Sequence, residues 1–456
     1  MPQSDTIAAI ATGLPGAIGI VRLSGPKAVE AASALFRPLG GGRLEARQEK
    51  NLVYGALLDG GGQVIDWILA TYCRGPASYT GEDTVELHCH GSPMVLSLAL
   101  EALFALGCCQ AQAGEFTRRA FLAGKLDLAQ AEAVADLMDA ASREAVRHSA
   151  GQLGGALSRR TGEIYSALVD LAAHFCAVLD YADEEIDPFT AETIFRTLTA
   201  QEQALTSLLA TWRRGQQVTR GVPCALLGRP NAGKSSLLNA LLGYERAIVT
   251  SIPGTTRDTI EERCQMGSVT LRLVDTAGLR QSDDPVEQLG VERSLAAMER
   301  SGLIFYLWDR TGPFVPEDET ALCRAAEHAP VILLCTKCDL PGKRYLPPLP
   351  EQIPVVEVSA HTGEGLDVLE QRVEEVFPAP PQETYGELLT NQRQAEGAQR
   401  ALECLVRARE ALGAGFPPDA VLADVEEGMK ALGELTGQSI REDVTDRIFR
   451  RFCVGK

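Results

Sequence analysis

The stretch VPCALLGRPNAGKSSLLNALLG, residues 222–243, decides the fold of the central part of the chain. It is typical of a strand, a glycine-rich loop and a helix in succession. Within it, Gly228-x-x-x-x-Gly233-Lys234-Ser235 matches the phosphate-binding P-loop in the context that this pattern requires. The glycines let backbone N–H groups curl around phosphates, the helix start adds positive potential, the lysine reaches the β- and γ-phosphates, and the serine binds Mg²⁺. The stretch therefore predicts a nucleotide site in an α/β domain.

Three further segments lie after the P-loop, each at the end of a predicted strand. RLVDTAG (272–278) places Asp275 where a carboxylate can hold the Mg²⁺ shell, and its glycine N–H can meet the γ-phosphate. VILLCTKCD (331–339) ends in Asp339, which can accept from the N1–H and 2-amino group of guanine, a donor pair that adenine lacks. VEVSAHTG (356–363) offers its serine and alanine as a backbone contact to the guanine carbonyl. This set resembles the guanine-specific GTPases.

Two positions depart from the GTPase patterns. Where the family has Asn this chain has Thr336, which is shorter and lacks the amide, so we expect a lower guanine affinity. Ras-like enzymes place a water-orienting Gln directly after Asp-Thr-Ala-Gly, but Leu279 stands there, and a hydrophobic side chain cannot polarise water. Glu287 is the candidate for this catalytic role, and its alternative is an ordinary solvated loop carboxylate.

Asn231 and the segment VTSIPGTTRD (249–258) resemble the potassium-activated GTPases. In those enzymes a cation stands in the place of an arginine finger, ligated by an Asn and by backbone carbonyls of an ordered switch loop. The resemblance implies the K⁺ ligands Asn231, Thr250, Ile252 and Thr255, with Mg²⁺ held by Ser235 and Thr256.

The composition limits the class of protein. The 456 residues suggest about three domains. A net charge of −18 without a Lys/Arg-rich tract argues against a free-standing nucleic-acid clamp, so any such contact is local or supported by a basic partner. No apolar run approaches the about 20 residues that span a bilayer, and the N-terminus lacks a basic segment before an apolar one. We therefore expect a cytoplasmic protein with no membrane contact.

The twelve cysteines are scattered and are typical of reduced thiols. Cys335-x-x-Cys338 has a redox outline, but these cysteines flank the base-recognition segment, which explains their position. The run from His88 to His90, with one cysteine between them, suggests metal ligands, yet no second ligand pair lies at zinc spacing. We favour a strand whose side chains alternate between two faces.

Helical sequence flanks the α/β segment on both sides, which predicts a multidomain fold. Residues 1–121 mix β-like runs, turns and one helix-like run, and predict an α+β domain. Ala/Leu-rich stretches in 122–216, one of them helical over 126–153, and in 379–456 predict an all-α domain. The α/β segment 217–378 interrupts it. Because domain termini often lie close together, we favour an inserted module over a linear string of four domains.

The flanking segments and the P-loop together resemble one family. The segments are GIVRLSG (19–25), SYTGEDTVELHCHG (78–91), AGEFTRRAFLAGKLDLAQAEAVADL (113–137), GRPNAGKSSLLNALLG (228–243) and FCVGK (452–456). They look like the tRNA modification GTPase family known as MnmE or TrmE, and the resemblance covers essentially the whole chain. It implies a folate-binding N-terminal domain that dimerises, a helical domain of two segments, and a G domain inserted in it.

The resemblance also implies an activity. Family members are homodimers that pair with an FAD-binding, NADH-using protein, MnmG (also GidA), in a hetero-oligomer. Together they add an aminomethyl or carboxymethylaminomethyl group to C5 of the tRNA wobble uridine, with 5-formyl- or methylene-tetrahydrofolate as one-carbon donor. GTP hydrolysis goes with potassium-dependent pairing of the G domains. Two alternatives stay open: a regulatory switch such as a ribosome-assembly GTPase, and a folate module with a vestigial G domain.

The resemblance implies four folate contacts, Arg22, Glu86, Lys125 and Lys456. A carboxylate can accept two hydrogen bonds from the aminopyrimidine edge of a pterin, and cations can meet its carbonyls and the glutamate tail. Cys453 is the family's terminal cysteine, with a chemical role as one hypothesis and a small apolar residue as the other. The expected GTP-binding residues are Asn231, Ala232, Gly233, Lys234, Ser235, Ser236, Thr250, Ser251, Ile252, Pro253, Gly254, Thr255, Thr256, Asp275, Thr276, Ala277, Gly278, Thr336, Lys337, Asp339, Ser359, Ala360 and His361.

The chain ends in RRFCVGK (450–456). Its last four residues have the outline of a prenylation box, but Gly455 is not aliphatic and lysine is not a usual final residue. We expect a helix over 441–452 that docks the end of the chain. The last four residues would then reach a site on another domain, the folate pocket, in the same chain or across the dimer.

Overall fold

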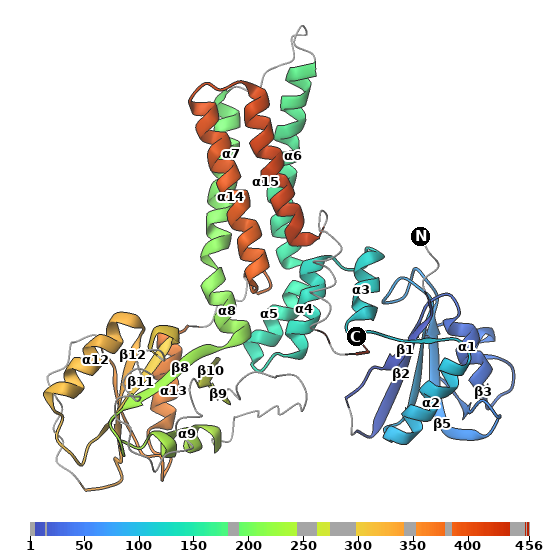
Figure 1. Cartoon of the computed structure of the whole chain (residues 1–456), viewed down its shortest axis with the longest axis horizontal. Helices are drawn as coiled ribbons and strands as arrows, with labels where there is room; N and C mark the ends of the chain where they lie inside the picture. The colour runs from blue at the N-terminus through green and yellow to red at the C-terminus, as the bar shows by residue number, and fades with distance from the viewer. Residues whose placement is uncertain are drawn as a thin grey trace. The chain divides into compact units, whose positions relative to one another are not determined.

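The computed structural model describes residues 5–13, 16–180, 191–243, 262–273, 298–341, 353–378, 385–437, 452, 454 and 455 (Figure 1). Its contacts divide the chain into two compact units, each assembled from segments that are distant in sequence. Unit 1 comprises residues 1–135, 153–201 and 400–456, and unit 2 comprises residues 136–152 and 202–399.

A seven-stranded sheet forms the N-terminal part of unit 1, in the order β3-β4-β5-β6-β2-β1-β7. Neighbouring strands are antiparallel, except for the parallel pair β1 and β7. The strands are β1 (Ile7–Ile10), β2 (Ile18–Ser24), β3 (Phe36–Pro38), β4 (Val53–Leu58), β5 (Val64–Cys73), β6 (Thr84–His90) and β7 (Cys109–Gln110), with a 3₁₀ turn η1 (Leu44–Ala46) between β3 and β4.

The two faces of this sheet differ in their cover. Helices α1 (Ala28–Leu35) and α2 (Pro93–Ala105) cover one face and form the main core with it (Figure 1). On β6, Cys89 points into that core, while the flanking histidines lie on the opposite, partly exposed face. The predicted strand with alternating faces is therefore confirmed.

Helix α3 (Glu115–Leu122) packs near the β1 edge of the other face through Phe116, which is buried against Ile7, Ala9 and Ala111. On the same face, the more central strands β2 and β6 carry the partly exposed charged residues Arg22 and Glu86. This face of the sheet therefore has an apolar, helix-covered edge beside a polar, accessible centre.

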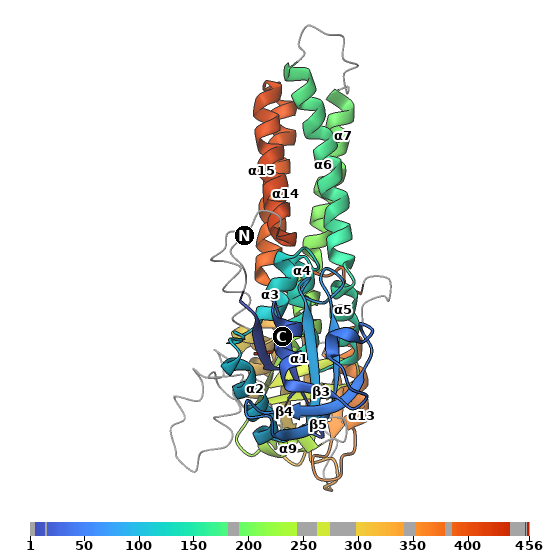
Figure 2. The same cartoon turned by 90° about the vertical axis from the view of Figure 1, so that its right-hand side faces the viewer.

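Four long helices from both sides of the central segment run alongside one another (Figures 1 and 2). Within unit 1, α6 packs on α15, Arg407 of α14 forms ion pairs with Asp424 and Glu427 of α15, and Arg409 of α14 lies over the Phe195 ring of α7. The all-α domain is thus built from segments before and after the α/β segment, and the expected fold class with an inserted G domain is confirmed. The helices are α6 (Ala156–Asp180), α7 (Ala191–Ala210), α14 (Gln392–Gly413) and α15 (Pro418–Thr436).

The stretch 126–153, predicted as helical throughout, is broken into α4 (Leu128–Met138) and α5 (Arg143–Leu153). The Ser142 hydroxyl accepts from the Ala145 N–H at 3.0 Å and so satisfies a donor at the start of α5. The apolar period continues across the break, which explains why the sequence pattern missed it. A side-chain cap starts a second helix at a point that the hydrophobic spacing does not mark.

The second sheet lies in unit 2, in the order β13-β12-β11-β8-β10-β9, and is parallel except for the β9–β10 hairpin. Helices α9 and α13 pack on one face and α12 on the other. Two covered faces explain the nearly continuous apolar strands, as in other parallel sheets. The elements are α8 (Trp212–Arg220), β8 (Val222–Gly228), α9 (Lys234–Gly243), β9 (Glu262–Met266), β10 (Val269–Leu273), β11 (Leu303–Asp309), α12 (Pro316–His328), β12 (Val331–Thr336), β13 (Val355–Val358) and α13 (Leu366–Val376).

Candidate functional site

The P-loop joins the carboxyl end of β8 to the start of α9, in the middle of the parallel sheet. Gly228 has φ 141°, and a Cβ added there would lie 2.3 Å from the Leu307 carbonyl oxygen. Asn231 and Gly233 also have positive φ, 63° and 92°. Such a run of unusual backbone angles curls the chain back on itself, so its N–H groups can converge on one anion.

Lys234 is the first residue of α9, and its ammonium lies inside the loop. Its Nζ donates to the carbonyl oxygens of Gly228 at 2.5 Å and of Arg229 at 2.8 Å. Partial burial lowers the pKa of Lys234. Among the described residues, the partners recorded for this cation are these two backbone carbonyls, and a phosphate group offers it the formal negative charge that they lack.

Thr336, the departure from the GTPase pattern, ends β12 and is buried. Its hydroxyl lies 2.8 Å from the Ala232 carbonyl oxygen and 3.2 Å from that of Trp308. The side chain therefore connects the base-recognition segment directly to the P-loop, so the shorter residue has a structural partner of its own.

Asp339 and Ser359 meet beside the ends of β12 and β13. The buried Ser359 hydroxyl donates to the Asp339 carboxylate at 2.6 Å, and this hydrogen bond lowers the pKa of Asp339. The N–H groups of His361 and Thr362 in turn point at the Ser359 oxygen, at 3.3 Å and 3.2 Å. The carboxylate is thus held ionised and exposed, as an acceptor for a base with two adjacent donors requires.

The residues on either side of Asp339 also have local roles. Lys337 adopts φ 61° and pairs with Asp309 at 2.5 Å, which fixes the turn after β12. Burial raises the pKa of Cys335 to about 11, and burial together with nearby carboxylates raises that of Cys338. Both thiols are therefore protonated at neutral pH, which does not favour redox chemistry for this CxxC.

Part of the predicted nucleotide site lies outside the described residues. The same holds for the predicted terminal lysine, terminal cysteine and C-terminal helix, apart from Phe452. The residues concerned are Thr250, Ser251, Ile252, Pro253, Gly254, Thr255, Thr256, Asp275, Thr276, Ala277, Gly278, Leu279, Glu287, Cys453, Lys456 and residues 441–451.

A second cluster of predicted site residues lies on the accessible face of the N-terminal sheet. Arg22 and Glu86 are directly opposite each other in the β2–β6 ladder, with Nη2 and Oε1 2.9 Å apart. His88 lies at the other carboxylate oxygen of Glu86, 3.3 Å away. The pair stays partly exposed, with side-chain exposures of 20% and 31%, so a flat polar ligand can reach both charges.

Lys125, the third predicted folate residue, follows α3 and is exposed. Its Cε lies 3.6 Å from where a Cβ on Gly81 would be, so its side chain runs beside the loop between β5 and β6. The structure thus pairs Arg22 with Glu86 and places Lys125 next to a neighbouring loop, without recording a direct contact between Lys125 and either of them.

Two of the three described residues of the tail, Val454 and Gly455, lie beside the N-terminal sheet of the same chain. Val454 forms an antiparallel bridge with Ala113, and Phe452 packs against Ala131. Gly455 is buried with φ 97°, and a Cβ on it would lie 2.1 Å from the Ile10 carbonyl oxygen. The end of the chain therefore reaches another domain, at the end of β1.

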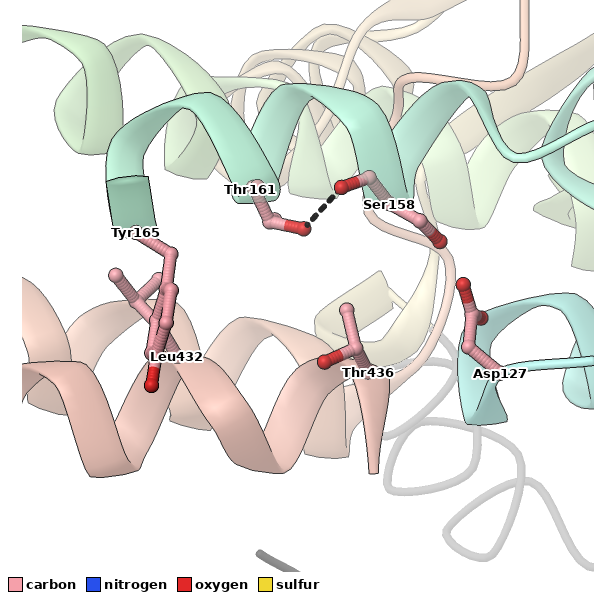
Figure 3. Close-up of a pocket in the computed structure, with 7 residues that line it drawn as sticks. Asp127, Ser158, Thr161, Tyr165, Leu432 and Thr436 are labelled. Atoms are coloured by element: carbon pink, nitrogen blue, oxygen red, sulfur yellow. Dashed lines mark hydrogen bonds between the residues drawn. The ribbon is translucent and has the colours of Figure 1, made fainter. Parts of the chain in front are cut away.

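A cavity of about 180 Å³ in unit 1 lies between the start of α4 and the helices α6 and α15 (Figure 3). Figure 3 shows the Asp127 carboxylate and the Ser158 side chain at the same end of this cavity. No predicted site residue lines it, and the Asp127 carboxylate also accepts from the Gln130 N–H at the start of α4. Its lining residues are Asp127, Ser158, Thr161, Gly162, Tyr165, Leu432 and Thr436.

Comparison with known proteins places this architecture in a family. Residues 128–453 match the model of the MnmE helical domain, and residues 6–125 match that of the GTP-binding protein TrmE N-terminus. The protein of Chloroflexus aurantiacus named tRNA modification GTPase MnmE is 43% identical over 460 residues, which cover 100% of both chains. The chain belongs to the MnmE family. The Thermus thermophilus protein of the same name is 43% identical over 458 residues, again covering 100% of both chains.

Each of the two MnmE family models covers one of the two candidate sites. The N-terminal model covers the whole first sheet, with Arg22, Glu86 and Lys125, and the helical model extends to Cys453.

Among solved structures, the G domain of the FeoB iron transporter of T. maritima is 30% identical, covering 34% of this chain and 98% of that chain, with a TM-score of 0.25.

Within the described part of the chain, no helix is both long and apolar enough to cross a membrane. Among those residues there is also no group of three or more His, Cys, Asp or Glu side chains arranged to hold a metal ion.

Proposed function

We propose that this chain is a potassium-activated GTPase that, with an FAD-dependent partner, adds an aminomethyl or carboxymethylaminomethyl group to C5 of the tRNA wobble uridine. A tetrahydrofolate derivative is the one-carbon donor. Membership of the MnmE family makes the chain a GTP hydrolase that takes part in tRNA modification. The potassium ion, the folate, the position of the modified base and the partner are the finer part of the proposal.

The P-loop geometry supports the GTPase part. In the proposed reaction the loop N–H groups bind the phosphates, Lys234 neutralises charge on the β- and γ-phosphates, and Asp339 selects guanine. Ser235 and Thr256 would hold Mg²⁺, which offsets developing phosphate charge. Asn231 has a positive φ of 63° and is exposed, and its accessible amide suits a ligand to a cation beside the phosphates. That cation would take the place of an arginine finger.

One observation carries the modification part: the Arg22–Glu86 pair and a P-loop occur in the same chain. A switch that only times the binding of a partner has no need of a charged pair on an open sheet face. In our proposal, Glu86 accepts from the aminopyrimidine edge of the pterin and Arg22 meets its carbonyl, with Lys125 and Lys456 at the glutamate tail. The FAD partner would supply the redox step.

We assign one proposed function to each of the domains predicted from the sequence. We assign residues 1–121 to folate binding and homodimer formation, and 122–216 with 379–456 to the helical domain. We assign 217–378 to the G domain, whose potassium-dependent pairing in the dimer drives the cycle. The hetero-oligomer with the MnmG-type partner would act on tRNA in the cytoplasm.

The first test is the amount of modified wobble nucleoside in cells that carry Lys234→Ala, measured by mass spectrometry. We expect the modified nucleoside to be lost, and Arg372→Ala, an exposed cation on α13 in the same domain, to leave it unchanged. Unchanged levels in the Lys234 variant would refute the proposal. Co-purification with ribosomal subunits, and not with an FAD protein, would favour a regulatory switch instead.

The second test examines the potassium site independently of the rest of the proposal. GTP turnover of the purified chain should fall strongly when Na⁺ replaces K⁺, and Asn231→Ala should abolish the difference between the two salts. Equal turnover in both salts would remove the potassium site and leave the rest of the proposal standing.

A further inference from the structure

The loop between β5 and β6 is held by several of its side chains. Thr80 and Ser24 share a hydrogen bond of 2.7 Å between their hydroxyls, and both residues are fully buried. The Ser24 hydroxyl also donates to the Glu82 carboxylate at 2.8 Å, which Arg119 of α3 contacts at 2.8 Å. This loop is therefore fixed to β2 on one side and to α3 on the other, with little freedom to rearrange when a ligand binds.

Tyr79 lies in the middle of this fixed loop and is exposed over 42% of its surface. Its hydroxyl nevertheless has a partner in the interior, the Thr117 hydroxyl at 3.0 Å, and Thr117 is fully buried. Burial of this end of the side chain raises the pKa of Tyr79. An exposed aromatic ring usually turns freely, whereas this one is tethered at its far end and held by a rigid loop at its near end.

The tethered ring stands beside the two charges of the candidate folate site. The Cζ atom of Arg22 lies 5.9 Å from the centre of the Tyr79 ring and 5.7 Å from that of Phe116. Arg22 in turn pairs with Glu86. One exposed aromatic ring and one accessible carboxylate therefore both lie next to the same guanidinium.

The chemistry of a pterin is complementary to this ring and this carboxylate, because a pterin is a flat π system with hydrogen-bond donors along one edge. Its edge can give two hydrogen bonds to a carboxylate, and its face can stack on an aromatic side chain. We propose that Tyr79 is the aromatic platform on which the pterin ring of the folate stacks, and that Thr117 is the positioning residue that fixes the platform. This inference rests on the proposed folate function and adds a binding residue to it.

The alternative role for Tyr79 is to anchor the loop through its hydroxyl alone. The two roles predict opposite results for two substitutions. Stacking needs the ring, and the hydroxyl only tethers it, so Tyr79→Phe should weaken binding about threefold, as loss of the tether does, and Tyr79→Leu should weaken it about tenfold. An anchor needs the hydroxyl and not the ring, so both substitutions should then have the same effect.

The experiment is titration of the full-length chain with 5-formyltetrahydrofolate by calorimetry. Tyr79→Leu should weaken binding about tenfold, in line with the loss of one stacking partner for a base. Tyr54→Leu is the matched control, because Tyr54 is an exposed tyrosine of the same sheet, stacked on Trp67. Its dissociation constant should equal that of the wild type.

A second pair of variants tests the positioning role of Thr117. Thr117→Val keeps the shape and removes the hydroxyl, so binding should weaken about threefold as the ring loses its tether. Thr117→Ser restores a hydroxyl and should recover wild-type binding. GTP turnover should stay at the wild-type rate in both, which a general loss of folding would not allow.

The outcomes separate this inference from the function on which it rests. If the wild type does not bind 5-formyltetrahydrofolate, the folate part of the proposed function fails, and the inference fails with it. If the wild type binds and Tyr79→Leu binds equally well, only the platform is refuted. Equal losses in Tyr79→Phe and Tyr79→Leu would also overturn it in favour of the anchor.

Discussion

The Thr336 hydroxyl lies 2.8 Å from the Ala232 carbonyl oxygen and so connects the end of β12 to the phosphate-binding loop. The two residues are 104 positions apart, and each belongs to a different recognition segment, one for the base and one for the phosphates. A side chain at this position therefore acts on both parts of the proposed GTP site. The sequence comparison with Asn had suggested only a loss of affinity, whereas the structure assigns the threonine a contact of its own.

We predict that Thr336→Val weakens GTP binding. Valine has the same shape but leaves the buried Ala232 carbonyl without this donor, at a cost of about 1–3 kcal/mol. Fluorescence titration with a labelled guanine nucleotide should show a dissociation constant raised roughly tenfold or more. Thr336→Ser, which keeps the hydroxyl, is the control and should stay close to the wild type. Wild-type affinity in the valine variant would show that the contact has no part in nucleotide binding.

Gly228→Ala should disrupt the P-loop. The added Cβ would meet the Leu307 carbonyl oxygen at 2.3 Å, and φ 141° is unfavourable for any side chain, so the end of β8 must shift. We expect a free energy of unfolding reduced by more than about 1 kcal/mol and a loss of nucleotide binding. Chemical denaturation and nucleotide titration measure the two effects.

Gly243→Ala is the matched control for this substitution. Gly243 ends α9, and a Cβ there meets nothing within 4 Å, so alanine should leave stability unchanged or raise it by up to about 1 kcal/mol. If both alanine variants bound nucleotide like the wild type, the close approach to Leu307 would not be what shapes the loop.

The strand, loop and helix around Gly228 were predictable because neighbouring residues determine them. Other contacts depend on the register of paired strands and on where the chain reverses, and a local sequence pattern predicts neither. Arg22 and Glu86 lie 64 positions apart and meet because β2 and β6 pair in one particular register. The bridge between Ala113 and Val454 is of the same kind. Tyr79 lay within a motif that identified the family, yet only the three-dimensional neighbours gave it a role.

His148 should make the stability of the helical region depend on pH. Burial lowers its pKa to about 4, from the usual 6.5, and its Nδ1 accepts a hydrogen bond from the Gly386 N–H at 3.0 Å. Because the unfolded chain binds a proton below about pH 6.5 and the folded one does not, stability falls as the pH drops from that value towards 4. At pH 5 this single group should reduce the free energy of unfolding by about 2 kcal/mol relative to pH 7.

The measurement is denaturant unfolding at pH 7 and pH 5 for the wild type and for His148→Asn. Asparagine offers an acceptor oxygen to the Gly386 N–H but does not titrate in this range. Carboxylates titrate in both proteins, so the difference between their pH dependences isolates His148. If the two proteins lost the same stability between pH 7 and pH 5, His148 would not be buried in its neutral form.

The end of the chain should be required for modification and not for GTP hydrolysis. A Cβ on Gly455 would lie 2.1 Å from the Ile10 carbonyl oxygen, and φ 97° is unfavourable for alanine, so Gly455→Ala should displace the tail from the N-terminal sheet. Val21, the partner of Ile10 in the β1–β2 ladder, is next to Arg22 of the candidate folate site. We therefore expect less modified wobble nucleoside by mass spectrometry and a wild-type rate of GTP turnover.

A C-terminal extension should have the same effect as Gly455→Ala, because Gly455, the last described residue, fits closely against the Ile10 carbonyl at the end of β1. Gly413→Ala is the control: it lies at the end of α14, where a Cβ meets nothing within 4 Å, and both activities should be unchanged. Loss of GTP turnover in Gly455→Ala would mean that the tail supports the whole fold instead of one site. Normal modification in the extended chain would show that the end of the chain does not have to dock for the reaction to proceed.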